Sequence, residues 1–250
     1  MKDPAPPLPP HPVLGEYYRD SSGRSHFVRG LFDSSAPFYD GMTALVSLGS
    51  GQWYRSFALA RHGLRPGMRL LDVATGTGVV VQAALKHTKD LKKILGVDAS
   101  IGMLLEARRK LPLRAVQGSG DALPIRSETF DMITIGFALR HFSDLRRAFE
   151  EYHRVLAPGG KLLILEITAP ESRAGRALLG FFMGRLVPAV VRLTTRNKDA
   201  ALCMRYYWET TRQCVPPEAI LEALHSAGFE HVERKVWFGS SSEYSATRPQ

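Results

Sequence analysis

The most constraining feature of this chain is a run of small residues between two apolar segments, the second of which ends in a carboxylate. Residues 70–80 read Leu-Leu-Asp-Val-Ala-Thr-Gly-Thr-Gly-Val-Val, and Asp98 ends a second apolar segment, Ile-Leu-Gly-Val-Asp. This pattern predicts a strand, a tight turn, a helix and a second strand. Such a turn lets a nucleoside lie against the backbone, and the carboxylate can accept hydrogen bonds from both ribose hydroxyls. The sequence therefore predicts a nucleoside-binding site.

The spacing of the small residues indicates which nucleoside the turn binds. A dinucleotide-binding turn carries three glycines in the pattern G-x-G-x-x-G, and its helix N-terminus faces a pyrophosphate. Here Val81 takes the place of the third glycine, while Ala74, Gly76 and Gly78 follow a two-residue rhythm. This rhythm favours S-adenosylmethionine, which has no phosphate, over NAD. A nicotinamide oxidoreductase is the alternative with less support.

From residue 68 onward, short apolar segments alternate with helical ones, which is typical of an α/β fold with a doubly wound parallel sheet. The predicted strands are residues 69–73, 93–97, 114–117, 130–136, 161–167, 231–238 and 243–247. The predicted helices are residues 100–110, 144–156 and 217–227. In the first helix we expect Ser100 as the N-cap, and Ile101, Met103, Leu104 and Leu105 facing inward. The expected fold is a Rossmann-like, mostly parallel, seven-stranded sheet.

Three segments are expected along the chain. Residues 1–15 are so rich in proline that we predict a flexible tail. Residues 16–62 are predicted to form an aromatic-rich helical N-terminal cap. The α/β domain covers residues 63–250, and it carries an inserted helical lid at residues 171–214, where a compact fold would use a short link.

Composition narrows the classes of partner and site. The formal net charge of +9 suits nucleic acid, an anionic membrane or an ordinary basic protein, and the sequence shows no RNA-binding module. We therefore predict no nucleic-acid partner. Cys203 and Cys214 are the only cysteines, and no histidine or cysteine cluster has metal-ligand spacing, so reduced thiols and no metal are expected. With no apolar secretory segment after Met1, a cytoplasmic location is expected.

Several blocks of the sequence together resemble the ubiquinone/menaquinone-biosynthesis C-methyltransferase family, a group of class I S-adenosylmethionine-dependent methyltransferases. The matching blocks are residues 32–34, 39–40, 71–78, 118–124, 130–131, 137–140, 154–166 and 227–229. The resemblance implies that residues 63–250 are a methyltransferase domain that methylates a carbon of an electron-rich aromatic ring or quinol. Two alternatives stay open: an O-methyltransferase of an aromatic secondary metabolite, and a non-methylating cyclase that binds the cofactor on the same fold.

The resemblance also assigns cofactor-binding residues. They are Asp72, Ala74, Thr75, Gly76, Thr77, Gly78, Asp98, Ala99, Met103, Ser119, Gly120, Asp121, Gly136 and Phe137. The turn at residues 72–78 would face the methionine portion and Asp98 the ribose. Ser119 and Gly120 would contact the adenine, where many relatives carry Asp or Asn at the position of Ser119. Asp121 is either a compensating adenine contact or a solvated turn acid.

This chain departs from the family pattern at positions expected to touch the methyl acceptor. Thr43 stands where the family has Asn, Gly51 where it has His, and Tyr54 where it has Trp. In addition, Val79 replaces a frequent Asp and His141 a common Asn. The methyltransferase assignment is therefore firmer than the identity of the acceptor.

Methylation of a ring carbon needs a base and a cation, because ionisation of the adjacent hydroxyl makes that carbon nucleophilic. We predict Arg140 as the cation, holding a phenolate or an ordered water, and His141 as a base that titrates near neutrality. The ring of Tyr39 would face the sulfonium. The structural alternatives are a salt bridge for Arg140, a helix cap for His141 and a core position for Tyr39.

The lid segment at residues 172–198 mixes apolar residues with arginines, which is typical of basic amphipathic helices. Its longest uncharged stretch, residues 177–184, is too short to span a bilayer. Its apolar face either packs on the domain or touches a membrane. Tyr206, Tyr207 and Trp208 are expected to form aromatic walls for a planar acceptor. The predicted partner is a small hydrophobic aromatic or quinol substrate, with peripheral membrane contact and a homodimer as further hypotheses.

Overall fold

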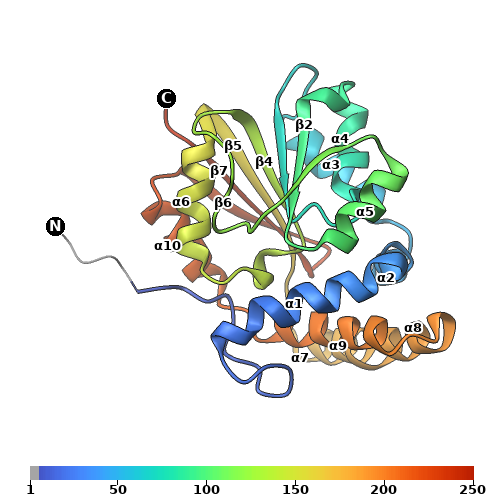
Figure 1. Cartoon of the computed structure of the whole chain (residues 1–250). Helices are drawn as coiled ribbons and strands as arrows, with labels where there is room; N and C mark the ends of the chain where they lie inside the picture. Colours follow the sequence, from blue (N-terminus) through green and yellow to red (C-terminus); the bar gives the residue numbers. More distant parts are fainter. Residues whose placement is uncertain (1–5) are drawn as a thin grey trace.

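A computed structural model describes residues 6–250 and centres on one seven-stranded sheet (Figure 1). The strands are β1 (Leu70–Val73), β2 (Ile94–Asp98), β3 (Arg114–Gln117), β4 (Phe130–Gly136), β5 (Leu156–Ile167), β6 (Glu230–Trp237) and β7 (Ser241–Thr247). Their order is β3-β2-β1-β4-β5-β7-β6. Strand β7 runs antiparallel to both β5 and β6, and the other neighbouring pairs are parallel. The predicted mostly parallel, doubly wound sheet is confirmed. Its strand order reverses between β1 and β4, where such sheets bind ligands.

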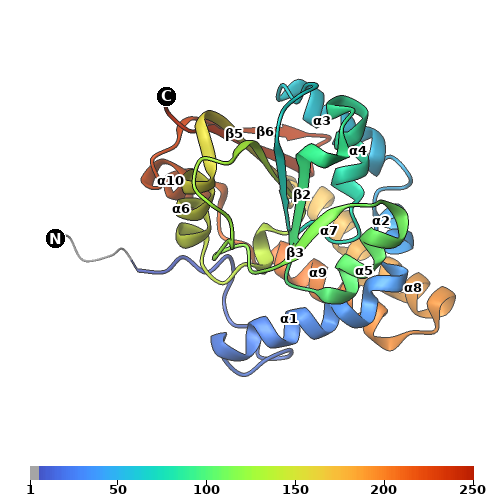
Figure 2. The same ribbon diagram turned by 45° about the horizontal axis from the view of Figure 1, so that its top comes forward.

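Helices cover both faces of the sheet (Figures 1 and 2). On one face lie α3 (Gly51–Arg61), α4 (Val79–Thr88) and α5 (Ile101–Lys110). On the other lie α6 (Leu145–Val155) and α10 (Pro217–Ser226). Short helical turns are η1 (Ala36–Phe38), η2 (Leu91–Lys93) and η3 (Leu139–His141). The central strands are buried between these layers, so they hold their carboxyl ends rigidly in place.

Helix α5 begins as predicted but presents a narrower apolar face. The Ser100 side chain accepts a hydrogen bond from the Met103 N–H, which confirms the N-cap. Met103 and Leu104 are buried, whereas Ile101 and Leu105 are 45% and 51% exposed. The prediction that Ile101 and Leu105 face inward is therefore wrong. The two residues are four positions apart and so share one helix face, which is turned away from the core.

A second layer of helices lies along the carboxyl edge of the parallel strands, below the sheet in Figure 1. It contains α1 (Ser21–Ser35) and α2 (Tyr39–Val46) from the N-terminal cap, together with the lid inserted after β5. The lid comprises α7 (Arg173–Phe181), the π-helical turn η4 (Phe182–Leu186), α8 (Val187–Thr195) and α9 (Lys198–Arg212). Cap and lid share one apolar cluster, so segments far apart in sequence form a single roof.

Part of the predicted flexible tail instead packs on the domain. The Leu8 N–H donates to Asp144 at 2.9 Å, and the Pro10 carbonyl accepts from the Val215 N–H at 2.8 Å. Farther along, His11 and Leu14 are buried. The prediction is therefore wrong for residues 8–14, because an extended proline-rich strap still offers carbonyl acceptors and apolar rings to its neighbours. Residues 1–5 lie outside the described residues.

The helix formed by α7, η4 and α8 is continuous from Arg173 to Thr195. At 23 residues, it is the one helix in the described part of the chain with the length and apolar composition of a membrane span. The uncharged stretch at residues 177–184 is only part of this helix, which runs through Arg185 without a break. Met183, Val187 and Val191 pack into the cap-and-lid cluster, while most of the remaining surface is exposed.

Candidate active site

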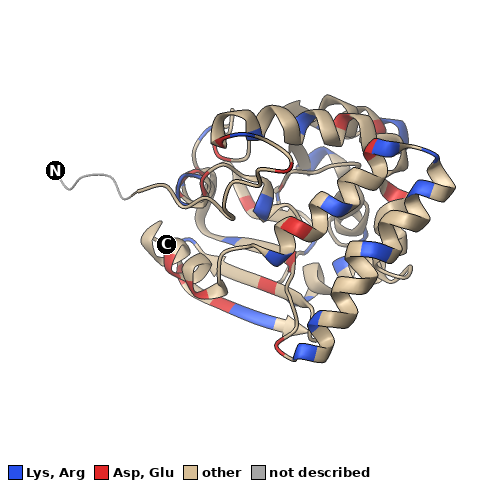
Figure 3. Cartoon of the chain, turned by 90° about the horizontal axis from the view of Figure 1, so that it is seen from below, with Lys and Arg blue, Asp and Glu red and all other residues tan. Residues whose placement is uncertain are grey.

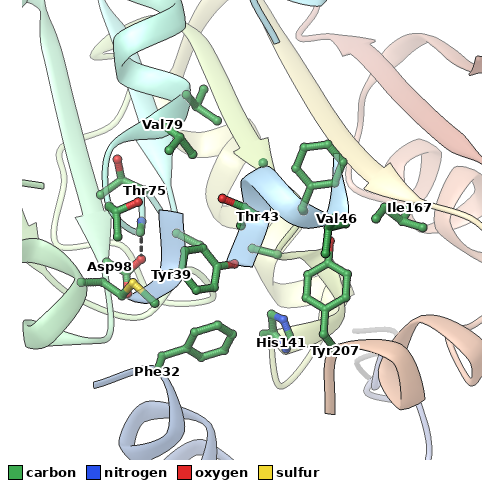
Figure 4. A pocket seen from close by; sticks show the side chains of 18 of the residues that line it. Phe32, Tyr39, Thr43, Val46, Thr75, Val79, Asp98, His141, Ile167 and Tyr207 are labelled. Atoms are coloured by element: carbon green, nitrogen blue, oxygen red, sulfur yellow. Dashed lines mark hydrogen bonds between the residues drawn. The ribbon is translucent and has the colours of Figure 1, made fainter. Parts of the chain in front are cut away.

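A cavity of about 610 Å³ lies between the sheet edge and the roof of cap and lid helices. Its floor is the turn after β1 with the ends of β2 and β4, and its walls come from α1, α2, α3 and the lid (Figure 4). That volume is in the range of small-molecule sites. The predicted nucleoside turn therefore forms the floor of a pocket that the cap and lid helices partly cover.

The turn after β1 is held in shape from below by Asp72. Its carboxylate accepts hydrogen bonds from the Thr75 and Thr134 hydroxyls, each at 2.7 Å. Burial raises the pKa of Asp72 to about 6. This carboxylate is buried outside the cavity wall. Asp72 thus fixes the backbone of the turn, in which Ala74 and Gly76 both have a φ of 54°, from a position behind the cavity wall.

Asp98 stands at the end of β2 and faces the cavity (Figure 4). Its carboxylate accepts from the Gly76 N–H at 2.7 Å and from the Ser100 N–H at 2.8 Å. Burial raises the pKa of Asp98 to about 6, although these N–H groups oppose the shift. The carboxylate is therefore ionised at neutral pH, and its remaining lone pairs can accept hydrogen bonds from a vicinal diol.

Most of the predicted cofactor residues come together around this cavity. Those lining it are Ala74, Thr75, Gly76, Thr77, Asp98, Ala99, Met103, Ser119, Gly120, Gly136 and Phe137. Gly78 does not line it, and serves as the N-cap of α4 with a φ of 80°. Asp121 also lies outside, where it accepts a hydrogen bond from the Ser119 hydroxyl. This position is the one expected for a turn acid, and an adenine contact of Asp121 stays a prediction.

Two residues of α2 close the roof over the turn. Asp40 accepts a hydrogen bond from the Thr77 hydroxyl and forms an ion pair with Lys110. Tyr39 lies between the Asp98 end and the His141 end of the cavity (Figure 4). Burial raises the pKa of Tyr39 well above its usual range, so it stays a neutral phenol. The structure therefore brings Tyr39 to the cavity, as expected.

Arg140 forms a buried ion pair. It is fully buried outside the cavity wall, where its guanidinium pairs with Glu166 and donates to the Thr210 hydroxyl at 3.0 Å. The same group lies 3.8 Å from the centre of the Tyr207 ring. The structure gives Arg140 the salt bridge of the structural alternative, with Glu166 from β5 and with Thr210 and Tyr207 from the lid, and its catalytic role stays a prediction.

His141 does line the cavity, but its protonation differs from the prediction. Its ring stacks on Tyr206 at 5.7 Å and meets Phe32 edge-on at 5.0 Å. Neither ring nitrogen has a hydrogen-bond partner within residues 6–250. Burial, together with the nearby Arg140, lowers the pKa of His141 well below 6.5. It therefore does not titrate near neutrality, and a neutral imidazole faces the cavity.

The second half of the cavity is apolar and comes mainly from the roof. Its residues include Phe32, Val46, Ile167, Leu179, Met183, Met204 and Tyr207. Of the three predicted aromatic walls, Tyr207 lines the cavity, Tyr206 lies behind His141, and Trp208 packs against lid glycines. Sequence reasoning missed Arg55 of α3, which also lines the cavity. The one sequence signal for Arg55 was its position one helical turn after Gly51, because the chain departs from the family pattern at Gly51.

Metal ligands do not gather at this site. Across residues 6–250, no group of three or more His, Cys, Asp or Glu side chains could hold a metal ion.

Comparison with known sequences gives a match over most of the chain. A sequence model of the ubiE/COQ5 methyltransferase family matches residues 20–242. The demethylmenaquinone methyltransferase of Lactiplantibacillus plantarum is 31% identical over 231 residues, which cover 89% of this chain and 96% of that protein. The ubiquinone/menaquinone biosynthesis C-methyltransferase UbiE of Coxiella burnetii is 32% identical over 210 residues, covering 81% and 83%.

Solved structures share the fold at lower identity. An S-adenosylmethionine-dependent methyltransferase of Thermotoga maritima has a TM-score of 0.61 at 19% identity, covering 88% of this chain and 99% of its own. The cyclase SpnF has a TM-score of 0.64 at 18% identity, covering 90% and 96%. These likenesses bear on the fold alone.

Proposed function

The chain belongs to the ubiE/COQ5 methyltransferase family and is an S-adenosylmethionine-dependent methyltransferase, and on that premise we propose that it methylates a ring carbon of a lipophilic quinol. The observation that carries this proposal is the two-part cavity. One half has the small-residue turn and the Asp98 carboxylate. The other is lined mainly by apolar side chains, among which lie the neutral His141 imidazole, two phenols and the Arg55 guanidinium. Such a lining suits a planar, apolar acceptor with few polar groups.

In this proposal, the turn and Asp98 hold the cofactor. The turn at residues 74–77 packs against the methionine portion, and Asp98 accepts hydrogen bonds from the ribose hydroxyls. Ser119 and Gly120 flank the adenine, where a Cβ on Gly120 would lie 2.4 Å from the Phe142 ring. When bound, the cofactor supplies a methyl group already activated on a sulfonium. The protein therefore mainly aligns the donor with the acceptor and excludes water.

In the acceptor half, His141 is the group that meets the quinol hydroxyl. Its unpartnered ring nitrogen can accept a hydrogen bond from that hydroxyl and thereby increase the electron density of the adjacent ring carbon. Once this carbon carries the methyl group, it loses its own proton to solvent, which restores the aromatic ring. The low pKa of His141 keeps the nitrogen unprotonated and able to accept. Tyr39 and Tyr207 wall the same region as neutral phenols.

The test is acceptor selectivity. We would supply S-adenosylmethionine with a short-chain demethylmenaquinol, its oxidised quinone or a catechol, and measure S-adenosylhomocysteine by mass spectrometry. The reduced quinol should give a higher kcat/KM than its quinone, which has no hydroxyl to donate electron density to a ring carbon. It should also exceed the catechol, which is too small to fill the apolar half of the cavity. A preference for the catechol would contradict the proposal, and a methyl group on one of its oxygens would identify O-methylation.

We also infer that the outer face of the lid helix contacts an anionic membrane surface. Leu178 and Leu193 are 71% and 77% exposed, and Phe181 and Leu186 are exposed beside them. Arginines border these residues along a helix that has no acidic residue from Arg173 to Thr195 (Figure 3). Leu179 and Met183 of the same helix line the cavity, so a lipophilic acceptor could pass from the membrane under the lid.

Cosedimentation with vesicles tests this contact. Wild type should bind vesicles that contain an anionic lipid better than purely zwitterionic ones, and Leu178→Ser/Phe181→Ser should lose most of that binding. Leu105→Ser, at an exposed leucine of α5, is the matched control and should bind normally. If the protein instead forms a dimer without lipid, and the lid face is buried in that dimer, this face binds a second copy of the chain and not a membrane.

A further inference from the structure

Arg55 is a buried cation that lacks a counterion. The side chain lies on α3, lines the cavity, and leaves only 7% of the residue exposed. Its Nε is buried with no hydrogen-bond partner, and no carboxylate of the described residues forms an ion pair with it. The guanidinium carbon is 5.0 Å from the centre of the Phe137 ring. A buried charge without a partner is costly, so its retention at a cavity wall points to a ligand.

The chain makes room for this guanidinium one helical turn earlier. A Cβ on Gly51 would lie 2.6 Å from Nη1 of Arg55 and 2.9 Å from the Ser47 hydroxyl. Any larger side chain would therefore push the guanidinium out of its present position. The place of the Arg55 guanidinium thus depends on the absence of a side chain at residue 51.

The acidic groups nearest to Arg55 already have other partners. Asp72 accepts from two threonine hydroxyls, and Asp40 accepts from Thr77 and pairs with Lys110. Tyr39 and Tyr207 are neutral phenols, since burial raises the pKa of each. The guanidinium therefore remains free for an anionic group that enters the cavity.

We propose that Arg55 is the anion-binding subsite of the cavity and binds a carboxylate or oxyanion of a bound ligand through its planar, two-pronged guanidinium. Two ligands could bring that group. One is the amino-acid carboxylate of S-adenosylmethionine, which follows from the cofactor class alone. The other is the ionised hydroxyl of the acceptor, which rests on the proposed function.

Binding measurements distinguish the two sources without needing turnover. Calorimetry would compare S-adenosylmethionine with its decarboxylated analogue on wild type, Arg55→Met and Arg55→Lys. If the donor carboxylate is the ligand, wild type favours the carboxylate form at least tenfold. Arg55→Met then abolishes that preference while leaving the affinity for the decarboxylated form unchanged, and Arg55→Lys restores part of it.

A coloured phenol reports on the second source. If the acceptor oxyanion is the ligand, wild type lowers the apparent pKa of bound 4-nitrophenol in absorbance titrations, and Arg55→Met removes this shift without changing donor affinity. Because neither readout needs the natural acceptor, failure of the quinol assignment would leave the subsite testable. The proposal is overturned if Arg55→Met, with an unchanged melting temperature, affects neither the donor preference nor the phenol shift.

Gly51→Ala gives an independent variant that keeps the charge. The added methyl group should displace the guanidinium and reproduce at least part of the Arg55→Met defect in whichever readout responds. Gly41→Ala is the matched control, because a Cβ on Gly41 of α2 would have nothing within 4 Å. Equal binding by wild type and Gly51→Ala would contradict the role of Gly51 in placing the guanidinium.

Discussion

The carboxylate of Asp98 has a pKa of about 6 that burial sets, and this links cofactor binding to pH. Ribose hydroxyls donate to the ionised form, so binding should be complete above this pKa and be lost as pH falls through it. We expect the Kd for S-adenosylmethionine to rise about tenfold per pH unit below about pH 6 and to level off near pH 7. Calorimetry across this range measures the effect.

Asp72 has a similarly raised pKa and provides the control for that titration. Because Asp72 lies outside the cavity wall, Asp72→Asn should keep the pH dependence, whereas Asp98→Asn should bind weakly at every pH. A Kd that stays constant between about pH 5 and pH 8 would contradict the assigned role of Asp98.

The pairing of Arg140 with Glu166 makes a stability prediction. Arg140→Met leaves the Glu166 carboxylate buried and unpaired, so we expect a loss of about 3–5 kcal/mol in the free energy of unfolding. Urea denaturation measures this loss. The double variant Arg140→Met/Glu166→Met should recover much of it, since no buried charge remains. Equal losses in the single and double variants would show that the ion pair is not the cause.

For His141, in contrast to Arg140, we expect a substitution to change catalysis and not stability. His141→Phe keeps the aromatic packing against Tyr206 and Phe32 but removes both unpartnered nitrogens. We expect kcat for quinol methylation to fall about 10²-fold or more, while donor affinity and melting temperature stay near the wild-type values. Steady-state kinetics with saturating donor would show it, and an unchanged kcat would remove His141 from the proposed chemistry.

At the scale of elements, the contact between Asp40 of α2 and Thr77 of the cofactor turn is expected to hold the roof over the bound donor. Asp40→Ala removes an acceptor for the Thr77 hydroxyl as well as the ion pair with Lys110. A hydrogen bond to a charged group contributes about 1.5–3 kcal/mol, so donor affinity should fall about tenfold or more through a faster dissociation rate. Stopped-flow measurement of donor release checks this.

Lys110→Ala is the matched variant for the same contact. It removes only the partly exposed ion pair, for which we expect less than about 1 kcal/mol. If both variants release the donor at the same rate, the Thr77 contact does not hold the roof closed.

Periodicity predicted most of the elements, and long-range packing explains the exceptions. The turn, Asp98 and the strands β1–β4 follow local sequence signals and lie within a residue or two of the expected bounds. The predicted fifth strand begins at residue 161, whereas β5 already begins at Leu156. The first helix of the lid continues through Arg185 because an arginine can extend its charge to solvent from a helix surface.

The site residues also fall into two groups, those that local sequence signals predict and those that depend on long-range packing. Backbone-shaped positions such as Gly76 and Gly136 could be predicted, because small residues at strand ends leave room for a ligand or a close approach. The roles of Arg140, His141 and Arg55 could not, since each depends on burial by the cap or the lid. No local sequence pattern shows that Glu166 forms an ion pair with Arg140. Nor does one show that Arg55 has no ion-pair partner among residues 6–250.

At the scale of the whole molecule, the sheet edge and the roof together enclose the cavity. The sheet supplies the rigid cofactor turn, and cap and lid supply the apolar half, so donor and acceptor sites form together only when the roof is packed on the sheet. With the proposed function, this arrangement predicts direct methyl transfer from the donor to a ring carbon of an acceptor held in the same pocket.

The most direct test is the position of the transferred methyl group. The enzyme would be given S-adenosylmethionine labelled with ¹³C in the methyl group and a reduced, short-chain demethylmenaquinol, and the product would be examined by ¹³C NMR. We predict one labelled methyl resonance at the chemical shift of a ring-bound carbon. A labelled methyl at the shift of an aryl ether, or no transfer by protein that binds the donor, would contradict the account.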